Sequence, residues 1–107
     1  MSNAIYSIDE IRSIVAPVAK KHGVDRVYLF GSYARGSATE TSDVDLCVDA
    51  DALRGLFALS GLRIDLEEAL SKELDLITVN SLKYNKDPEF LDHLRKEQVL
   101  IYEIAGS

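Results

Sequence analysis

Three short apolar runs alternate with longer amphipathic stretches along this chain, and the alternation limits the folds that it can adopt. The runs cover 26–30, 44–48 and 74–79 and are rich in the β-branched and aromatic residues that favour strands. The stretches between them place apolar residues three and four positions apart, as on one face of a helix. We therefore predict an α+β or α/β-like domain, in which a small sheet is flanked by helices.

Local signals indicate where the helices begin and end. Ser7 followed by Glu10 forms a capping box, so the first helix is expected to begin after Ser7. Gly23 is suited to end that helix. Residues 50–72 predict a second helix. A capping aspartate and a proline at the first helical position predict a third helix over 87–96.

The chain of 107 residues has the usual size of one domain. We expect a single domain over 1–107, with 1–6 a flexible or tag-derived N-terminus, and a short edge strand or anchoring tail at 99–102. The lone cysteine, Cys47, cannot form an intrachain disulfide, which fits a reducing cytoplasm. Neither a signal peptide nor a membrane-spanning run is visible, so we expect a cytoplasmic protein without membrane contact.

Charge bears on possible partners. The formal net charge is -6, and the excess of acidic residues lies in 37–107. No stretch forms the basic stripe that binding to a phosphate backbone needs. We therefore expect no direct nucleic-acid binding by the isolated domain.

Two aspartates share one face of the second predicted strand. Side chains alternate along a strand, so Asp43 and Asp45 lie on one face about 7 Å apart and Val44 points to the other. No lysine or arginine at a matching position neutralises them, and a divalent cation such as Mg²⁺ would relieve their repulsion. Asp75, on a neighbouring strand, would add a third carboxylate. Three carboxylates can hold two ions roughly 3.5–4 Å apart for in-line phosphoryl transfer.

The first predicted strand ends at Gly31 and Ser32. Glycine lets the backbone turn and approach a ligand closely. The N–H groups of the turn and the Ser32 hydroxyl would form an anion site for the outer phosphates of a nucleotide. Arg35, one helical turn further on, could contact the same phosphates.

Each of these features has an ordinary structural explanation when taken alone. Ser42 and Asp43 could form a turn, Gly31 and Ser32 a loop, and Asp75 a charge on the polar face of a half-buried strand. Their joint occurrence is rarer, since average residue usage gives Gly-Ser at this spacing from Asp-x-Asp in on the order of one chain per thousand. Each part also falls on the element that the chemistry needs.

Three segments of the chain together match a known pattern. They are Gly-Ser-Tyr-Ala-Arg-Gly at 31–36, Ser-Asp-Val-Asp-Leu at 42–46 and Leu-Asp-Leu-Ile at 74–77. With their spacing, these segments resemble the minimal nucleotidyltransferases (MNT domains) of the DNA polymerase β superfamily. The resemblance implies a mixed β-sheet with flanking helices, two Mg²⁺ ions, and transfer of a nucleoside monophosphate from a triphosphate.

The resemblance also implies a role for each site residue. Asp43 and Asp45 would bind both metal ions, and Asp75 would bind the ion that activates the acceptor hydroxyl. Gly31 and Ser32 would hold the β and γ phosphates.

Many stand-alone domains of this kind resemble the antitoxin half of two-gene HEPN–MNT systems. The MNT protein there is similar to an adenylyltransferase that uses ATP to add AMP to a tyrosine of its HEPN ribonuclease partner. A chain this short has little left to bind an acceptor, so the acceptor surface is expected to belong to a HEPN toxin. Two alternatives stay open: a non-catalytic antitoxin that masks its toxin, and transfer to a small molecule such as an aminoglycoside or to an RNA end.

Other conspicuous residues are expected to be structural. A strand cysteine such as Cys47 is usually a small buried hydrophobe. His22 and His93 lie at or near predicted helix ends, without a second ligand at zinc spacing. Tyr33 is expected to pack against its neighbours. The acidic run 65–68, together with Glu73, is expected to be a solvated helix face.

Overall fold

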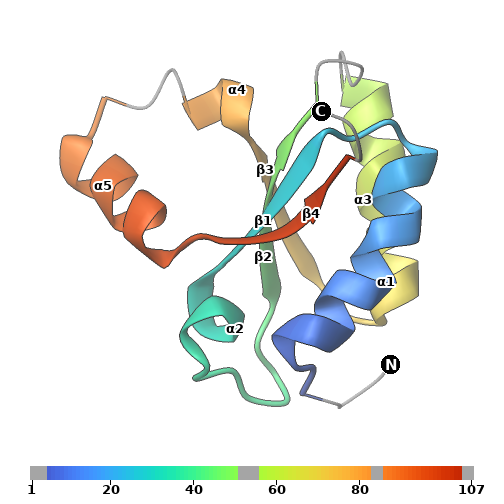
Figure 1. Ribbon diagram of the computed structural model, residues 1–107, viewed down its shortest axis with the longest axis horizontal. Coiled ribbons are helices and arrows are strands. Elements are labelled where there is room, and N and C mark those ends of the chain that lie inside the picture. The colour runs from blue at the N-terminus through green and yellow to red at the C-terminus, as the bar shows by residue number, and fades with distance from the viewer. Residues whose placement is uncertain (1–4, 51–55, 83–85, 105–107) are drawn as a thin grey trace.

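Four strands form one sheet in the computed structural model, which describes residues 5–50, 56–82 and 86–104 (Figure 1). The strands are β1 (Arg26–Phe30), β2 (Val44–Asp49), β3 (Leu74–Thr78) and β4 (Val99–Glu103). Their order across the sheet is β3-β2-β1-β4, so β3 and β4 are the edge strands.

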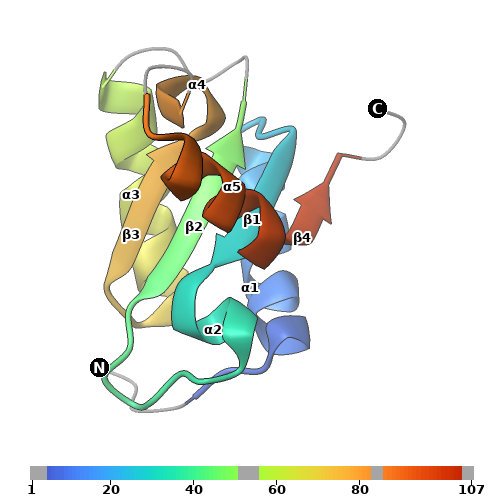
Figure 2. The same cartoon turned by 90° about the vertical axis from the view of Figure 1, so that its left-hand side faces the viewer.

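The helices lie on both faces of this sheet. α1 and α3 pack against each other and cover one face, which we call the core face (Figure 1). α5 lies over the opposite face, the far face, and contacts α2 (Figure 2). The helices of the described residues are α1 (Ile8–Lys21), α2 (Gly31–Arg35), α3 (Leu56–Leu70), α4 (Val79–Leu82) and α5 (Pro88–Glu97).

Strand directions make the sheet a mixed one. β1 is antiparallel to both of its neighbours, β2 and β4, and β2 is parallel to β3. A parallel pair cannot be joined by a tight turn, so the chain passes from β2 to β3 through α3 on the core face. The predicted α+β class, a small mixed sheet with flanking helices, is confirmed.

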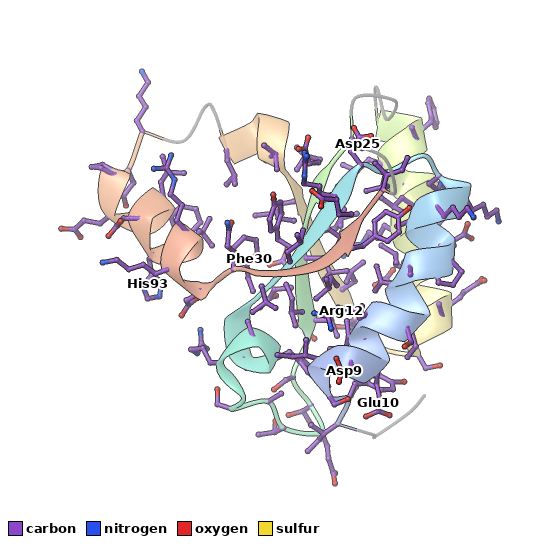
Figure 3. The ribbon with its side chains drawn as sticks, in the orientation of Figure 1. Asp9, Glu10, Arg12, Asp25, Phe30 and His93 are labelled. Atoms are coloured by element: carbon purple, nitrogen blue, oxygen red, sulfur yellow. The ribbon has the colours of Figure 1, made fainter. Side chains whose placement is uncertain are left out.

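The predicted caps are present at two helix starts. The Ser7 hydroxyl accepts a hydrogen bond from the Glu10 N–H at 3.1 Å, and the Glu10 carboxylate accepts one from the Ser7 N–H at 2.9 Å. Glu10 is labelled at this end of α1 in Figure 3. Asp87 caps α5 in a similar way, by accepting from the N–H groups of Glu89 and Phe90. Both helices therefore begin where the local chemistry predicts.

The core lies between the sheet and the pair α1 and α3. Alternate residues of β2 point into it, and each large apolar side chain buried there stabilises the fold by roughly 1.5–3 kcal/mol. Its fully buried members include Val44, Leu46 and Val48 of β2, Ile11 and Val15 of α1, and Leu62, Leu66 and Leu70 of α3.

Some boundaries differ from the prediction. α3 lies within the predicted helix 50–72, of which 51–55 lie outside the described residues. The third strand ends at Thr78 and is followed by α4, which was not predicted. There the Ser81 N–H and hydroxyl both donate to oxygens of Thr78, which turns the chain. The terminal run 99–102 forms the edge strand β4, extended by one residue.

The N-terminal segment is held in place shortly before α1. Residues 1–4 of the predicted flexible segment 1–6 lie outside the described residues. Tyr6 donates a hydrogen bond to the Leu70 carbonyl at 2.6 Å and so anchors the chain to the end of α3. Among the described helices, none has both the length and the apolar character needed to cross a bilayer.

Candidate active site

Asp45 and Asp75 are neighbours on the far face of the sheet. β2 and β3 are parallel, and their register pairs Asp45 with Asp75. The adjacent residues Val44, Leu46 and Leu74 are buried in the core, so the alternation along each strand turns both aspartates to the other face. Two carboxylates that are distant in sequence thus share one face of the sheet.

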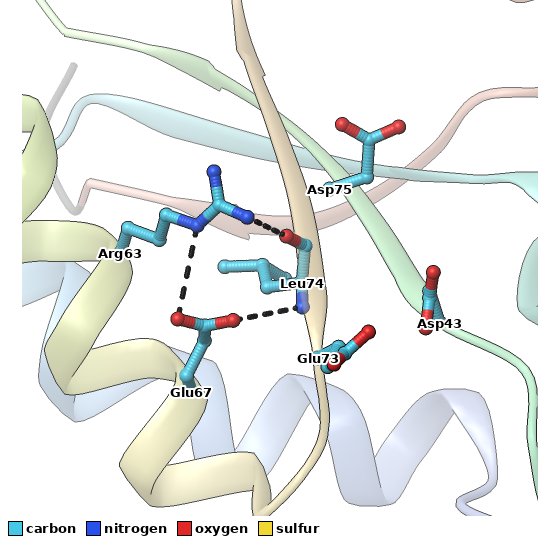
Figure 4. A pocket seen from close by; sticks show the side chains of 6 residues that line it. All are labelled: Asp43, Arg63, Glu67, Glu73, Leu74 and Asp75. Atoms are coloured by element: carbon cyan, nitrogen blue, oxygen red, sulfur yellow. Dashed lines mark hydrogen bonds and ion pairs between the residues drawn. The ribbon is translucent and has the colours of Figure 1, made fainter.

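Asp43 joins them from the residue before β2. Asp43 and Asp75 line the same cavity (Figure 4). The pKa of Asp45 is raised, first because burial removes water from its carboxylate and then because Asp75 and Asp43 add negative charge nearby. Within the described part of the chain, no lysine, arginine or histidine forms an ion pair with these three aspartates. Like charges therefore accumulate here without a direct ion pair to a protein cation among the described residues.

Gly31 brings the backbone against one of these carboxylates. It follows Phe30, the cross-strand partner of Asp45. Its φ is +71°, a conformation that side chains disfavour, and a Cβ at this position would overlap the Asp45 carboxylate. No residue with a side chain could occupy this position without moving Asp45. Ser32 is the next residue, in the first turn of α2.

Arg35 has a partner that its sequence position does not reveal. Its guanidinium donates to Glu97 of α5 at 2.9 Å, which links α2 to the helix over the far face. Its charge also acts on Asp45 by partly opposing the rise in that pKa. Arg35 therefore lies near the carboxylates, with its side chain bound to α5.

A buried lysine joins the segments that lead into the aspartates. Lys72 precedes β3 and is 6% exposed. Its ammonium group donates to the Glu40 carbonyl at 3.0 Å, in the loop before Asp43. A buried charge needs such a partner, so this bond ties the loop before Asp43 to the start of the strand that holds Asp75. No sequence pattern indicated this role.

Two side chains of α3 bind the edge of β3 beside Asp75 (Figure 4). Arg63 donates to the Leu74 carbonyl at 2.9 Å, and Glu67 accepts from the Leu74 N–H at 3.2 Å. The prediction that 65–68 is only a solvated helix face is therefore wrong for Glu67. Both side chains also line the cavity beside β3, which has a volume of about 350 Å³ and is lined by Asp43, Arg63, Glu67, Glu73, Leu74 and Asp75.

The chemistry of the donor set suits a hard divalent cation. Asp43, Asp45 and Asp75 supply carboxylate oxygens, which Mg²⁺ prefers. Among the described residues, no group of three or more Asp, Glu, His or Cys side chains is gathered tightly enough to hold an ion by itself. Mg²⁺ takes only one or two protein carboxylates and fills its shell with water and substrate phosphates. The shared face therefore fits Mg²⁺ that arrives with a phosphate ligand.

The residues expected to be structural have structural surroundings. Cys47 is buried, and burial together with the charge of Asp49 raises the pKa of its thiol to about 11. His22 lies 2.7 Å from the Asp65 carboxylate, a contact that also corrects the prediction of a solvated face at 65–68. His93 pairs with a glutamate of its own helix. Tyr33 is buried, as its packing role predicts.

Comparison with protein families gives one match that covers most of the chain. A family described as nucleotidyltransferase domain matches residues 11–103. A candidate protein adenylyltransferase of Methanocaldococcus jannaschii is 45% identical over 76 residues, which are 71% of this chain and 82% of the relative. The protein adenylyltransferase MntA of Thermococcus cleftensis is 38% identical over 84 residues, covering 75% and 85%.

Solved structures share the fold. A toxin–antitoxin complex with AMP-PNP contains a chain that superposes with a TM-score of 0.70 at 21% identity, covering 88% of this chain and 74% of that one. A complex of a tri-AMPylated HEPN toxin of Shewanella oneidensis with its MNT antitoxin gives a TM-score of 0.65 at 18% identity, covering 91% and 73%.

Proposed function

The chain belongs to the nucleotidyltransferase domain family, and from this membership we propose that it transfers AMP from ATP to a hydroxyl group of a partner protein in a Mg²⁺-dependent reaction. The acceptor is a tyrosine of a HEPN ribonuclease toxin, so the chain acts as an antitoxin. In the reaction the tyrosine oxygen attacks the α-phosphorus, pyrophosphate leaves, and the hydroxyl proton passes to a base.

The relatives support both the reaction and the partner. The relative from Thermococcus cleftensis is named a protein adenylyltransferase, and a solved complex of the same fold pairs an MNT antitoxin with an AMPylated HEPN toxin. The size of the chain agrees with this assignment. The sheet and its helices account for the described residues, so no further domain among them is available to bind the acceptor. The acceptor surface would then belong to the partner protein.

The register of Asp45 with Asp75, next to Gly31, is the observation on which the proposal rests most. Nucleotidyl transfer needs metal-binding carboxylates beside a place where backbone groups can reach phosphates. The pairing brings two carboxylates to one face, and Gly31 brings bare backbone against one of them. This juxtaposition costs stability in the folded chain, because burial and then the neighbouring negative charges raise the pKa of Asp45.

Each residue has a distinct task in the proposed reaction. Bound Mg²⁺ would neutralise phosphate charge and make a coordinated hydroxyl more acidic. Asp43 and Asp45 would hold both ions, and Asp75 would hold the ion that activates the acceptor hydroxyl and take the proton of that hydroxyl. The turn of Gly31 and Ser32 donates N–H and O–H groups to the β and γ phosphates, which stabilises the charge that builds up on the departing pyrophosphate.

The direct test is label transfer to the product of the neighbouring gene. The protein is incubated with Mg²⁺, that product, and each of four α-labelled nucleoside triphosphates in turn. We expect label from ATP on the partner, lost on addition of EDTA and in Asp43→Asn and Asp75→Asn. Asp49→Asn is the matched control, since Asp49 lies on β2, the strand that Asp43 directly precedes, but pairs with Arg26. Absence of transfer from every nucleotide, with an active control enzyme, would refute the proposal.

Neutralisation of the toxin separates catalysis from masking. If the antitoxin only covers its partner, a variant with both Asp43→Asn and Asp45→Asn will protect cells as well as the wild type does. We expect that variant to lose protection while still binding the partner in a pull-down.

A further inference from the structure

We infer that Arg63 and Glu67 are positioning residues for Asp75, because together they fix the backbone of Leu74, the residue before it. We call this pair of side chains the Leu74 clamp. The inference rests on the proposed function, in which Asp75 binds metal. It adds Arg63 and Glu67 of α3 to the three aspartates as residues on which metal binding depends.

The need for such a clamp follows from the place of β3 in the sheet. Among the described strands, β3 lies at an edge and pairs only with β2. The Glu73 carbonyl accepts a hydrogen bond from the Val44 N–H at 3.2 Å and so points toward β2. Backbone groups alternate sides along a strand, so the N–H and C=O of Leu74 point away from β2, toward a side where the described residues form no strand. Leu74 itself is only 2% exposed, so water cannot readily replace the missing strand.

The two α3 side chains supply both missing partners. The guanidinium of Arg63 donates to the Leu74 carbonyl at 2.9 Å, and the carboxylate of Glu67 accepts from the Leu74 N–H at 3.2 Å. The two residues lie one helical turn apart, and the Arg63 Nε is 3.7 Å from the Glu67 carboxylate. Each partner therefore holds the other in place while both hold the strand (Figure 4).

Asp75 depends on this backbone because its side chain has no other support. Its side chain is exposed, and within the described part of the chain it has neither a hydrogen bond nor an ion pair. The peptide unit after Leu74 sets the direction in which the Asp75 carboxylate leaves the strand. If that peptide unit is loosened, the Asp75 carboxylate is still present but is no longer held in one position. Outer groups that orient a metal ligand commonly affect metal affinity about 10- to 100-fold.

Metal binding is measured directly, without turnover. Mn²⁺ stands in for Mg²⁺ and is titrated by electron paramagnetic resonance in the presence of AMP-PNP, with the full chain. We expect Glu67→Ala to weaken Mn²⁺ binding about tenfold and to speed hydrogen exchange at the Leu74 amide. Glu68→Ala is the matched control, an exposed acid on the same helix, and should change neither quantity.

Two further variants separate the clamp from simple electrostatics. Glu67→Gln keeps an oxygen that can accept from the Leu74 N–H, so we expect binding within about twofold of the wild type. Arg63→Met removes a positive charge near the metal, which by Coulomb repulsion alone would strengthen Mn²⁺ binding. Loss of the hydrogen bond from Arg63 to the Leu74 carbonyl instead predicts weaker Mn²⁺ binding, a change of the opposite sign. Circular dichroism checks that each variant is folded. If Glu67→Ala does not fold, the two milder substitutions, Glu67→Gln and Arg63→Met, test the clamp by themselves.

The outcomes are distinct from failure of the proposed function. Tighter binding in Arg63→Met, or equal losses in Glu67→Gln and Glu67→Ala, would overturn the clamp and leave an electrostatic role. Unchanged Mn²⁺ binding in folded Glu67→Ala would overturn it as well. If Asp75→Asn leaves Mn²⁺ binding unchanged, the assignment of Asp75 fails, and with it the proposed function and the clamp together.

Discussion

Replacing Gly31 with alanine tests whether the backbone must approach Asp45. The substitution adds one methyl group at a residue with φ of +71°, where that methyl would overlap the Asp45 carboxylate. The left-handed backbone costs an alanine about 1–2 kcal/mol. Forcing Asp45 off its rotamer adds about 0.5–1.5 kcal/mol. Together these terms predict a loss of about 1.5–3.5 kcal/mol in the free energy of unfolding.

Gly36 provides a control for the backbone contribution alone. Its φ is +77°, nearly the same, but a Cβ there meets no atom within 4 Å. Gly36→Ala should therefore cost only the backbone share, about 1–2 kcal/mol. In the Asp45→Ala background the overlap at Gly31 disappears, since the Asp45 Cβ lies 3.5 Å away, an ordinary contact. There Gly31→Ala should cost no more than Gly36→Ala does.

Urea unfolding followed by circular dichroism measures all of these variants. For a domain of this size, each 1 kcal/mol corresponds to roughly 4–8 °C in Tm, so thermal melts will also separate the two glycines. Gly31→Ala should abolish nucleotidyl transfer, whereas Gly36→Ala should retain it. Equal losses of stability at the two glycines, or a Gly31→Ala cost that is the same with and without the Asp45 carboxylate, would refute the close approach.

Three further predictions concern single side chains. The folded-state pKa of Asp45 is raised, so its contribution to stability is complete below the unfolded-state pKa and is lost as pH rises through the folded-state pKa. Asp45→Asn should therefore be inactive yet more stable than the wild type at pH 7. The difference in Tm between the two proteins should shrink as the pH is lowered. Arg35→Ala should cost less than about 1 kcal/mol, because the Arg35 side chain of this ion pair is half exposed, and amide exchange in α5 should accelerate. Unchanged exchange would mean that the pair does not hold α5. Cys47 is buried, and its thiol has a pKa of about 11. It should therefore not react with an aromatic disulfide reagent at pH 8 until urea unfolds the chain. Rapid labelling of the native protein would contradict the burial.

Local chemistry made much of the fold predictable. The capping box of Ser7 and Glu10 and the cap at Asp87 depend only on residues three positions apart or fewer, so sequence spacing was enough. The two-residue period of a strand predicts the outward face of Asp45, whereas Asp43 lies just before β2. The mixed sheet was expected from family resemblance, because strand pairing joins distant segments that periodicity cannot relate.

Tertiary contacts explain what could not be predicted. The partner of Arg35 lies in α5, far along the chain, and Lys72 is buried because a loop carbonyl meets it. Glu67 has the sequence surroundings of a solvated helix face, and only the position of the β3 edge beside α3 gives it a backbone partner. Such roles depend on where elements pack, and a single sequence carries no local record of packing.

The alternation that places the acids on the far face also protects the strand pairing from error. A shift of β2 by one residue would turn Asp45 into the core and Val44 and Leu46 out of it. An ionised carboxylate without a partner is heavily penalised in such an interior, and the buried apolar contacts would be lost as well. The same shift in β3 would bury Asp75. The residues proposed to hold metal therefore also discourage misaligned sheets while the chain folds, whether or not any nucleotide is present.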